Sequence, residues 1–399
     1  MTPNLQQARR AVFTVFFVNG LTISSWLAVI PVIKERLGLS EGVLGLTLLA
    51  TAVGALLAMQ LTGWLLGRYG SRRITQITII YFVASVFLPL GAPSLFTLVL
   101  ALALFGAGNG ASDVAMNAQG VQVEDRYPKP IMSSFHGAWS LGSLSGAGLA
   151  ALLLFIGITG IWHAGVVAAL GAGLLVYALP RLLEAGDKTP TEADNSPRLR
   201  PRKLPRALLI LGLLSFLSLV SEGAVADWAA VYLREGLGSS LGLAPLGFAA
   251  FSLTMALGRF TGDTVAGRLG AAVTLRLSAL LSVLGLGAAL LMPTAPLALL
   301  GFGLMGLGVA NFAPLLFGAG GRVPGVPPGA GIAAVTTAGY TGFLVGPPLI
   351  GFTAEALGLR LALFLVVGFL AVIGVFASSA QVTPKATLTD GGPAEDLII

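Results

Sequence analysis

The chain has no cysteine and only two histidines among its 399 residues. Without cysteine it can form no disulfide bond, no thiolate metal site and no thiol nucleophile. Charge is scarce as well, because charged residues make up 10% of the chain, against roughly 25% in a soluble domain. Hydrophobic residues make up 55%, and the mean hydropathy is +0.89. This composition excludes a water-soluble fold and indicates a protein embedded in a lipid bilayer.

Catalytic and nucleotide-binding motifs are also missing from the sequence. No Gly-Lys-Ser or Gly-Lys-Thr occurs, which excludes the phosphate-cradling loop of an ATP-driven pump. No H-E-x-x-H motif occurs either, and two histidines without cysteine offer few groups for acid–base or metal chemistry. We therefore expect no enzyme, no cofactor and no metal site. The net charge of +6 comes from basic residues spread over short loops, which argues against a nucleic-acid partner.

Apolar stretches of about 20 residues, the length that crosses a bilayer, recur along the whole chain. Six lie in the first half, near residues 11–32, 42–66, 74–91, 94–121, 131–156 and 161–180. Six more lie near residues 207–233, 242–266, 272–292, 296–319, 329–353 and 359–379. The sequence thus predicts an all-α membrane protein with an N-terminal half (1–180), a polar linker (181–206), a C-terminal half (207–380) and a polar tail (381–399).

The basic residues orient these twelve spans. Eighteen of the 23 Lys and Arg residues fall in segments on one side of the bilayer. Only Lys34, Arg36, Arg234 and Arg360 fall on the other side, and Arg259 lies inside a span. Because Lys and Arg are retained in the cytoplasm, both termini and the linker are predicted to be cytoplasmic. We expect a multi-pass protein of a bacterial inner membrane, acting as a monomer.

An internal repeat relates the two halves at a fixed shift of 200 residues. Glu35 and Gly38 align with Glu235 and Gly238, and further matches occur without a gap in three other helical regions: Gly67, Arg68 and Gly70 with Gly267, Arg268 and Gly270; Gly106 and Gly108 with Gly306 and Gly308; Gly142 and Gly146 with Gly342 and Gly346. Shared register over four regions indicates an ancient duplication. In transporters such a duplication produces two six-helix halves around a central site near the bilayer midplane.

Several motifs resemble one family of transporters. The segment G-W-L-L-G-R-Y-G-S-R-R at 63–73 resembles the loop signature of the major facilitator superfamily, with Gly67 in place of its usual acidic residue. Four further segments together resemble bacterial permeases related to fucose permease: D-V-A-M-N-A-Q-G at 113–120, F-H-G-A-W-S-L-G at 135–142, E-G-A-V-A-D-W at 222–228 and G-Y-T-G-F-L-V-G-P-P at 339–348. The resemblance covers nearly the whole chain outside the linker and tail. It implies secondary active transport of a small molecule, coupled to protons, by alternating access.

The resemblance also implies a coupling acid in the fourth helix, and Asp113 occupies that place. Ionisable residues within a bilayer are costly, by about 2.5 to 3.5 kcal/mol on insertion scales, so each is a candidate functional residue. Asn109, Asp113 and Asn117 recur every four residues, which places them on one stripe facing the bundle interior. A carboxyl group in a weakly polar cavity can exchange protons near physiological pH. The alternative is a structural role for Asp113, as partner of a neighbouring amide or of His136.

The first helix departs from the family pattern. Where related permeases carry a second acid, this chain has only Asn19, Ser24, Ser25 and Trp26. We therefore do not assume that this chain couples transport to protons through two acids, as those permeases do.

Other ionisable residues lie in the seventh and fifth spans. Glu222 is near the middle of the seventh span, and Asp227 is about a turn and a half further on, so the two acids face different sides of the helix. Glu222 is a candidate proton or substrate site, or else a buried carboxyl that fixes helix contacts. Asp227, beside Trp228, is a candidate substrate or gating residue. His136 shares a face with Trp139 and could relay protons, or else lock two helices together.

Substrate contacts are expected from side chains that stack or form hydrogen bonds, because ligand sites combine apolar walls with a few aimed polar groups. Trp26 and Trp139 are candidates for stacking on a sugar ring or a flat metabolite, although aromatic residues in helices more often serve packing. The hydrogen-bonding candidates are Asn19, Asn109, Asn117, Asp227, Asn311 and Tyr340.

Candidate gating residues are charged: four are arginines and one is an aspartate. Arg259 and Asp263, four residues apart and expected near the cytoplasmic end of the eighth span, can form an ion pair that closes the inner mouth and breaks as the halves rock. Arg68, Arg72 and Arg73 can act in the same way, or serve only as a topology signal. Because Arg259 is expected far from the cavity, a neutral or zwitterionic solute is favoured over a strongly anionic one.

Three functions remain open at this point. Uptake of a polar solute with protons is favoured slightly. Proton-coupled export of drugs or amphipathic metabolites is the first alternative, because G-F-L-V-G-P-P-L-I-G at 342–351 resembles a glycine–proline signature of antiporters, although that signature usually lies in the fifth helix rather than the eleventh. A membrane sensor built on a transporter fold is the second alternative, and it would bind a ligand without moving it.

Overall fold

The computed structural model describes residues 4–128, 131–184 and 205–381, and within these ranges every regular element is a helix. Six helical segments form the N-terminal half: α1 (Leu5–Ala28) with α2 (Ile30–Leu37), α3 (Glu41–Tyr69), α4 (Ser71–Ser85) with α5 (Phe87–Gly91), α6 (Leu95–Glu124), α7 (Met132–Phe155), and α8 (Gly160–Ala178) with η1 (Leu179–Arg181). Six form the C-terminal half: α9 (Arg206–Val231) with η3 (Tyr232–Gly236), α10 (Leu246–Leu269), α11 (Ala271–Leu291), α12 (Ala295–Val309) with α13 (Phe312–Gly320), α14 (Pro328–Leu357), and α15 (Leu359–Val375) with η4 (Ala377–Ala380). The predicted all-α fold of twelve spans is confirmed.

Nine of these segments within the described residues are long and apolar enough to cross a membrane, namely all six of the N-terminal half and α9, α11 and α12 with α13. The helix α10 has spanning length but carries Arg259, Asp263 and Arg268, and α14 is rich in Gly, Pro and Thr. The helix α15 is apolar and shorter. Large apolar side chains cover the outside of the bundle, for example Val176 at 77% and Leu57 at 67% exposure. A surface of this kind is stable against lipid tails and not against water.

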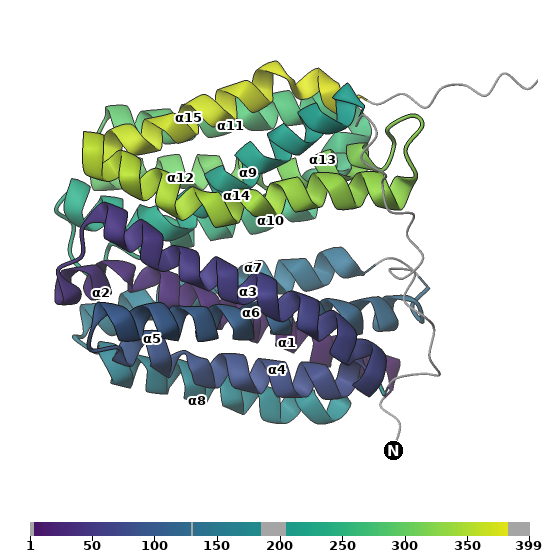
Figure 1. Ribbon diagram of the computed structural model, residues 1–399, viewed down its shortest axis with the longest axis horizontal. Coiled ribbons are helices and arrows are strands. Elements are labelled where there is room, and N and C mark those ends of the chain that lie inside the picture. Colours follow the sequence, from purple (N-terminus) through teal and green to yellow (C-terminus); the bar gives the residue numbers. More distant parts are fainter. Residues whose placement is uncertain (1–3, 129–130, 185–204, 382–399) are drawn as a thin grey trace, which may run out of the picture.

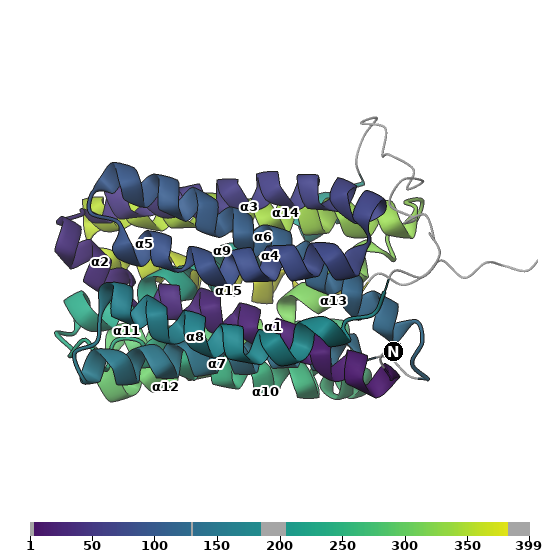
Figure 2. The same cartoon turned by 90° about the horizontal axis from the view of Figure 1, so that it is seen from below.

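The two halves lie side by side as separate bundles (Figure 1). They meet through α3 beside α14 and through α7 beside α10, and both pairs are visible in the turned view of Figure 2. We call the end of the molecule formed by α2, η3 and the last turns of α14 the α2 end. The opposite end, where α1 and α9 begin, we call the linker end.

The repeat seen in the sequence is also present in the helix contacts. A Cβ atom added to Gly106 in α6 would overlap the backbone carbonyl of Thr51 in α3, and one added to Gly306 in α12 would overlap that of Phe251 in α10. All four positions correspond at the shift of 200 residues. Small residues allow helix backbones to approach closely in membranes, where burial of apolar surface gives no drive for association. The shared glycine register is therefore a packing requirement in both halves.

Most polar contacts between the halves lie at the α2 end. Four hydrogen bonds join the two halves within the described residues. Three are at the α2 end, and the fourth joins Arg259 to Ser140 near the middle of the helices. The halves are thus tied together at the α2 end, and none of these bonds lies at the linker end of the described chain.

Candidate functional site

The polar stripe of α6 forms the first part of a central site. Asn117 donates a hydrogen bond from Nδ2 to the Asp113 carboxylate at 3.2 Å and another to its backbone carbonyl at 2.9 Å. Both side chains are partly buried. Asn109 lies one turn away on the same stripe, as the four-residue spacing predicts. Asp113 therefore has an amide partner on its own helix and retains capacity to accept further bonds.

Asn19 connects this stripe to α1 and α7. Its Nδ2 donates to Ser112 Oγ at 2.8 Å and to Asn109 Oδ1 at 3.4 Å, while its Oδ1 accepts a bond from Trp139 Nε1 at 2.9 Å. Asn19 itself is 1% exposed. It is therefore placed to orient Trp139, and it is too deeply buried in this structure to contact a ligand directly.

The C-terminal half contributes an ion pair. Arg259 of α10 lies 3.5 Å from the carboxylate of Glu222 in α9, measured from Nη2 to Oε1. Arg259 stands near the middle of α10 (Leu246–Leu269), not near its cytoplasmic end as the sequence suggested. The expectation placed Arg259 too near the end because α10 runs to Leu269, beyond the predicted residue 266. The side chain of its expected partner, Asp263, lies outside the described part of the chain.

Arg259 also reaches across to the N-terminal half. Its Nη1 donates to Ser140 Oγ of α7 at 3.4 Å, and its guanidinium lies 6.0 Å from the centre of the Trp139 ring. A cation at this distance from an indole face is attracted by the ring's electron density. Tyr340 of α14 lies within electrostatic reach of both Asp113 and Glu222.

These side chains from both halves make one group. We define the central polar cluster as Asn19, Asn109, Asp113, Asn117, Trp139, Ser140, Glu222, Arg259 and Tyr340.

Other candidates lie outside this cluster. Trp26 is 1% exposed and packs edge-on against Phe105, so its ring is part of the N-terminal core. The expectation that it stacks on a solute is therefore not met in this structure, because a buried aromatic ring gains more from packing. Asn311 lies between α12 and α13 with its amide against Gly262.

His136 and Asp227 lie within the spans but make few polar contacts. The His136 ring packs edge-on against Phe16 at 5.5 Å and lies within electrostatic reach of Arg259. Asp227 is partly buried, and none of the hydrogen bonds or ion pairs in the described chain involves its carboxylate. The backbone carbonyl of His136 accepts a hydrogen bond from Ser140 Oγ at 3.2 Å, whereas its ring has no hydrogen bond to the cluster in the described chain.

At the linker end, the described contacts of Arg68, Arg72 and Arg73 are all with the N-terminal half. Arg72 pairs with Glu184 and donates to the carbonyl of Pro180. Arg68 and Arg73 lie over the Tyr69 ring at 5.6 and 5.8 Å. Sequence reasoning missed Glu184, which supplies from the end of the sixth span an acid that the loop lacks at Gly67. Among the described contacts these arginines join no part of the C-terminal half.

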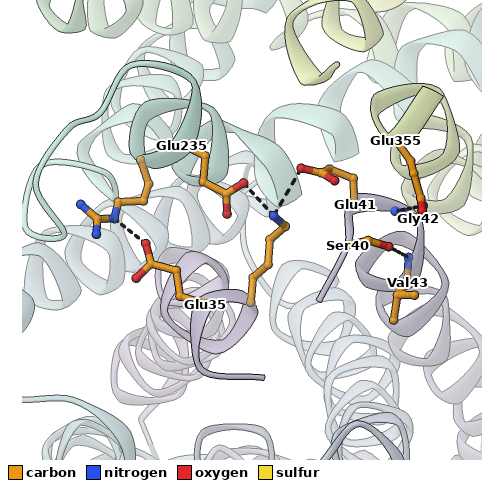
Figure 3. A network of polar contacts seen from close by, with 9 residues as sticks. Glu35, Ser40, Glu41, Gly42, Val43, Glu235 and Glu355 are labelled. Carbon is orange, nitrogen blue, oxygen red and sulfur yellow. Dashed lines mark hydrogen bonds and ion pairs between the residues drawn. The ribbon is translucent and has the colours of Figure 1, made fainter. Parts of the chain in front are cut away.

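The α2 end carries a network of ion pairs that the sequence analysis did not single out (Figure 3). Lys34 lies 2.7 Å from Glu235 of η3 and 3.3 Å from Glu41. Arg234 lies 2.6 Å from Glu35, and the backbone N–H of Gly42 donates to Glu355 of α14 at 2.9 Å. The only signal in the sequence was the alignment of Glu35 with Glu235 in the repeat.

Two six-helix bundles around polar side chains near the middle of the helices define a polytopic membrane transporter. The sequence profile of the Major Facilitator Superfamily matches residues 12–326. The chain belongs to this superfamily.

Its relatives are transporters or membrane proteins. It is 36% identical to the membrane protein MosC of Rhizobium meliloti, over 92% of this chain and 88% of that protein. It is also 36% identical to an uncharacterized MFS-type transporter of Yersinia pestis, over 92% of this chain and 94% of that one.

Solved structures share the fold at low sequence identity. A mutant of the nucleoside transporter NupG has a TM-score of 0.72 at 14% identity, covering 95% of this chain and 100% of the NupG chain. A bacterial homologue of the human lysosomal transporter Spinster, inward-facing and occupied, has a TM-score of 0.66 at 18% identity, covering 94% of this chain and 96% of the homologue.

Proposed function

We propose that this protein is a secondary active transporter that takes up a small polar solute together with protons across a bacterial inner membrane, by alternating access. The observation that supports this most directly is the central polar cluster. The Asp113 carboxylate, the Arg259 guanidinium and the Glu222 carboxylate all lie near the middle of their helices. Ionisable groups are costly at this depth in a membrane and are kept there for function. These side chains of the cluster also come from both halves, so a solute bound among them contacts both moving parts.

The orientation follows from the basic residues. Arg9, Arg68, Arg72 and Arg73 lie at the linker end, and positive charge is retained in the cytoplasm. The linker end then faces the cytoplasm and the α2 end faces the periplasm. With the halves tied together at the α2 end, the structure corresponds to a state that is closed to the periplasm.

Within the cluster, Asp113 is the proposed proton carrier. Its carboxylate has one amide partner in the described chain, Asn117. A proton on Asp113 would remove an uncompensated charge before the halves rock, and its release to the cytoplasm would reset the site. Trp139, Asn117 and Tyr340 are the proposed solute contacts, combining a ring that can stack with groups that form hydrogen bonds.

A thermal-shift screen of the purified protein tests this function and its alternatives. The panel contains sugars, polyols, nucleosides, amino acids and amphipathic cations, because a ligand selective for the folded state raises the melting temperature. Stabilisation by a polar solute, lost in Asn117→Ala and Trp139→Ala and followed by uptake into proteoliposomes, supports the proposal. Stabilisation only by amphipathic cations supports an exporter, and binding without any flux supports a sensor.

A further inference from the structure

Arg259 is held more loosely than the arginines at the α2 end. Its polar partners Ser140 and Glu222 lie at 3.4 and 3.5 Å. By contrast, Arg36 reaches two backbone carbonyls at 3.0 and 2.7 Å, and Arg234 reaches a carboxylate at 2.6 Å. A guanidinium has five N–H donors, and about a quarter (26%) of the Arg259 side chain is exposed. Among the contacts of the described residues, most of its capacity to donate hydrogen bonds is thus not used.

The position of Arg259 at the middle of a membrane helix indicates what its unused N–H donors could bind. A guanidinium at the middle of a membrane helix is costly and is retained where it serves a ligand or a partner. A planar fork of N–H groups matches a carboxylate, which it binds through two parallel hydrogen bonds. Trp139 lies against the same guanidinium and can support the apolar part of such a ligand. Asp113, a carboxylate of the same central polar cluster, disfavours a second negative charge on the ligand.

We propose, resting on the transport function above, that the solute carries a single carboxylate and that Arg259 binds it. On binding, the solute carboxylate replaces Glu222 as the partner of Arg259. Among the described residues, the charged or titratable groups near Glu222 are Arg259 of α10, which contacts it, and Tyr340 of α14, which lies within electrostatic reach. Deprived of Arg259, the Glu222 carboxylate takes a proton from water, because an unpaired charge in the membrane interior is costly. The proton on Glu222 then balances the charge of the bound anion, and the coupling proton on Asp113 crosses in addition to it.

Matched pairs of probes test this inference on the full chain in lipid nanodiscs. The pairs are D-glucuronate with D-glucose, D-gluconate with D-glucitol, and L-alanine with L-alaninamide, and inorganic phosphate is added as a dianion control. We expect at least one carboxylate to raise the melting temperature with an affinity at least about tenfold above its neutral or amide partner. The selectivity should be lost in Arg259→Gln and partly kept in Arg259→Lys.

The role of Glu222 has a separate readout. Because binding takes up a proton, carboxylate affinity should fall as pH rises, by up to about tenfold per pH unit. In Glu222→Gln the affinity should persist and become independent of pH. Equal binding of both members of every pair, preference for the neutral members, or no stabilisation by any carboxylate at about 10 mM would overturn the assignment. Uptake of a neutral probe in that case would leave the transport function standing while rejecting the carboxylate.

A second inference rests on a different observation, the symmetry of the ion pairs at the α2 end. Lys34 and Arg234 correspond at the shift of 200 residues, and so do Glu35 and Glu235. The pairs Lys34–Glu235 and Arg234–Glu35 are therefore the same contact made twice, once in each direction between the halves. The paired residues lie in the short segments α2 and η3, and each segment is followed within two residues by a glycine with positive φ, 62° at Gly38 and 64° at Gly238, a backbone conformation that favours glycine.

The contacts beside these pairs repeat as well. Gly42 donates its N–H to Glu355, while a Cβ atom at the equivalent Gly242 would touch Phe155, the equivalent of Glu355. Each half therefore places the start of its second span against the end of the other half's fifth span. We infer that the two reciprocal ion pairs are the periplasmic gate of this protein, a device that the duplication supplied in two copies.

Hydrogen–deuterium exchange of the full chain in nanodiscs tests the gate without a known solute. In Arg234→Glu, where Glu35 is met by a like charge, backbone exchange in residues 30–45 and 231–250 should rise at least about threefold while the linker end stays unchanged. The exchanged pair Glu35→Arg with Arg234→Glu should restore protection. Arg36→Gln is the control, because Arg36 contacts only carbonyls of its own half.

Two outcomes would reject the gate. Exchange at the α2 end that is unchanged in both Arg234→Glu and Lys34→Gln would show that the pairs do not hold the halves together. Failure of the exchanged pair to restore protection would show that the effect of Arg234→Glu does not come from the loss of its contact with Glu35.

Discussion

Asn19 makes three side-chain hydrogen bonds that join the first, fourth and fifth spans. Such bonds between membrane helices contribute about 0.6 to 2 kcal/mol each, and a buried partner left unsatisfied adds a desolvation cost. We expect Asn19→Ala to lower the free energy of unfolding by about 1 to 3 kcal/mol, measured by thermal unfolding in detergent. Asn109→Ala, which loses one long bond, should lose less. An equal loss in both variants would contradict the role of Asn19 as the connecting residue.

We expect the substitution Asp113→Asn to remove proton coupling while solute binding is kept. In Asp113→Asn the side chain keeps its shape but can no longer take up or release a proton, so solute exchange should persist while accumulation driven by a pH gradient falls at least about tenfold. Proteoliposome uptake at several pH values measures both. Asp125→Asn is the matched control, because Asp125 is an exposed residue just after the end of the same helix. Accumulation by Asp113→Asn with the wild-type pH dependence would exclude Asp113 as the proton carrier.

The sequence predicts some site residues better than others. The stripe of Asn109, Asp113 and Asn117 depends only on the period of one helix, and it is present as predicted. The partner of Arg259 depends on how α10 is rotated against α9, and the pairing of Arg72 with Glu184 depends on the packing of α4 against the end of the sixth span. A single sequence does not carry these rotations, so the two contacts were not predicted.

At the scale of the elements, apolar length was sufficient to locate the helices, while breaks within them were missed. The second span was predicted at 42–66 and is Glu41–Tyr69. The first span divides at Val29, where Pro31 begins α2 and cannot donate to the preceding turn. The tenth span divides at Asn311. Hydropathy does not report such breaks because both sides remain apolar.

Glycine positions give a prediction for the packing of α3 against α6. Gly106→Ala places a methyl group against the carbonyl of Thr51, and overpacking of this kind costs about 1 to 3 kcal/mol. Gly63→Ala in α3 meets no atom within 4 Å and should be neutral or slightly stabilising. Thermal unfolding of the two variants, with Gly306→Ala as the counterpart of Gly106→Ala in the other half, checks this. Equal stability of Gly106→Ala and Gly63→Ala would contradict the packing account.

At the scale of the whole molecule, the contacts between the two halves differ from one end of the molecule to the other. The described polar contacts between them lie at the α2 end and at Arg259, so a rocking motion has to break the first set and rearrange the second. The duplication explains why the outer contacts are reciprocal, whereas the central cluster is asymmetric: Asp113 lies in the fourth span and Glu222 in the seventh. Symmetric contacts suit closure of the halves, and asymmetric ones suit recognition of a solute.

The most direct test of proton-coupled transport is solute-induced proton movement in proteoliposomes loaded with a pH-sensitive dye. With no pH gradient imposed, any solute that stabilises the protein should acidify the vesicle interior when added outside, and Asp113→Asn should abolish the signal while Asp125→Asn keeps it. A solute that enters the vesicles without moving protons, or an acidification that Asp113→Asn leaves unchanged, would contradict proton coupling through Asp113.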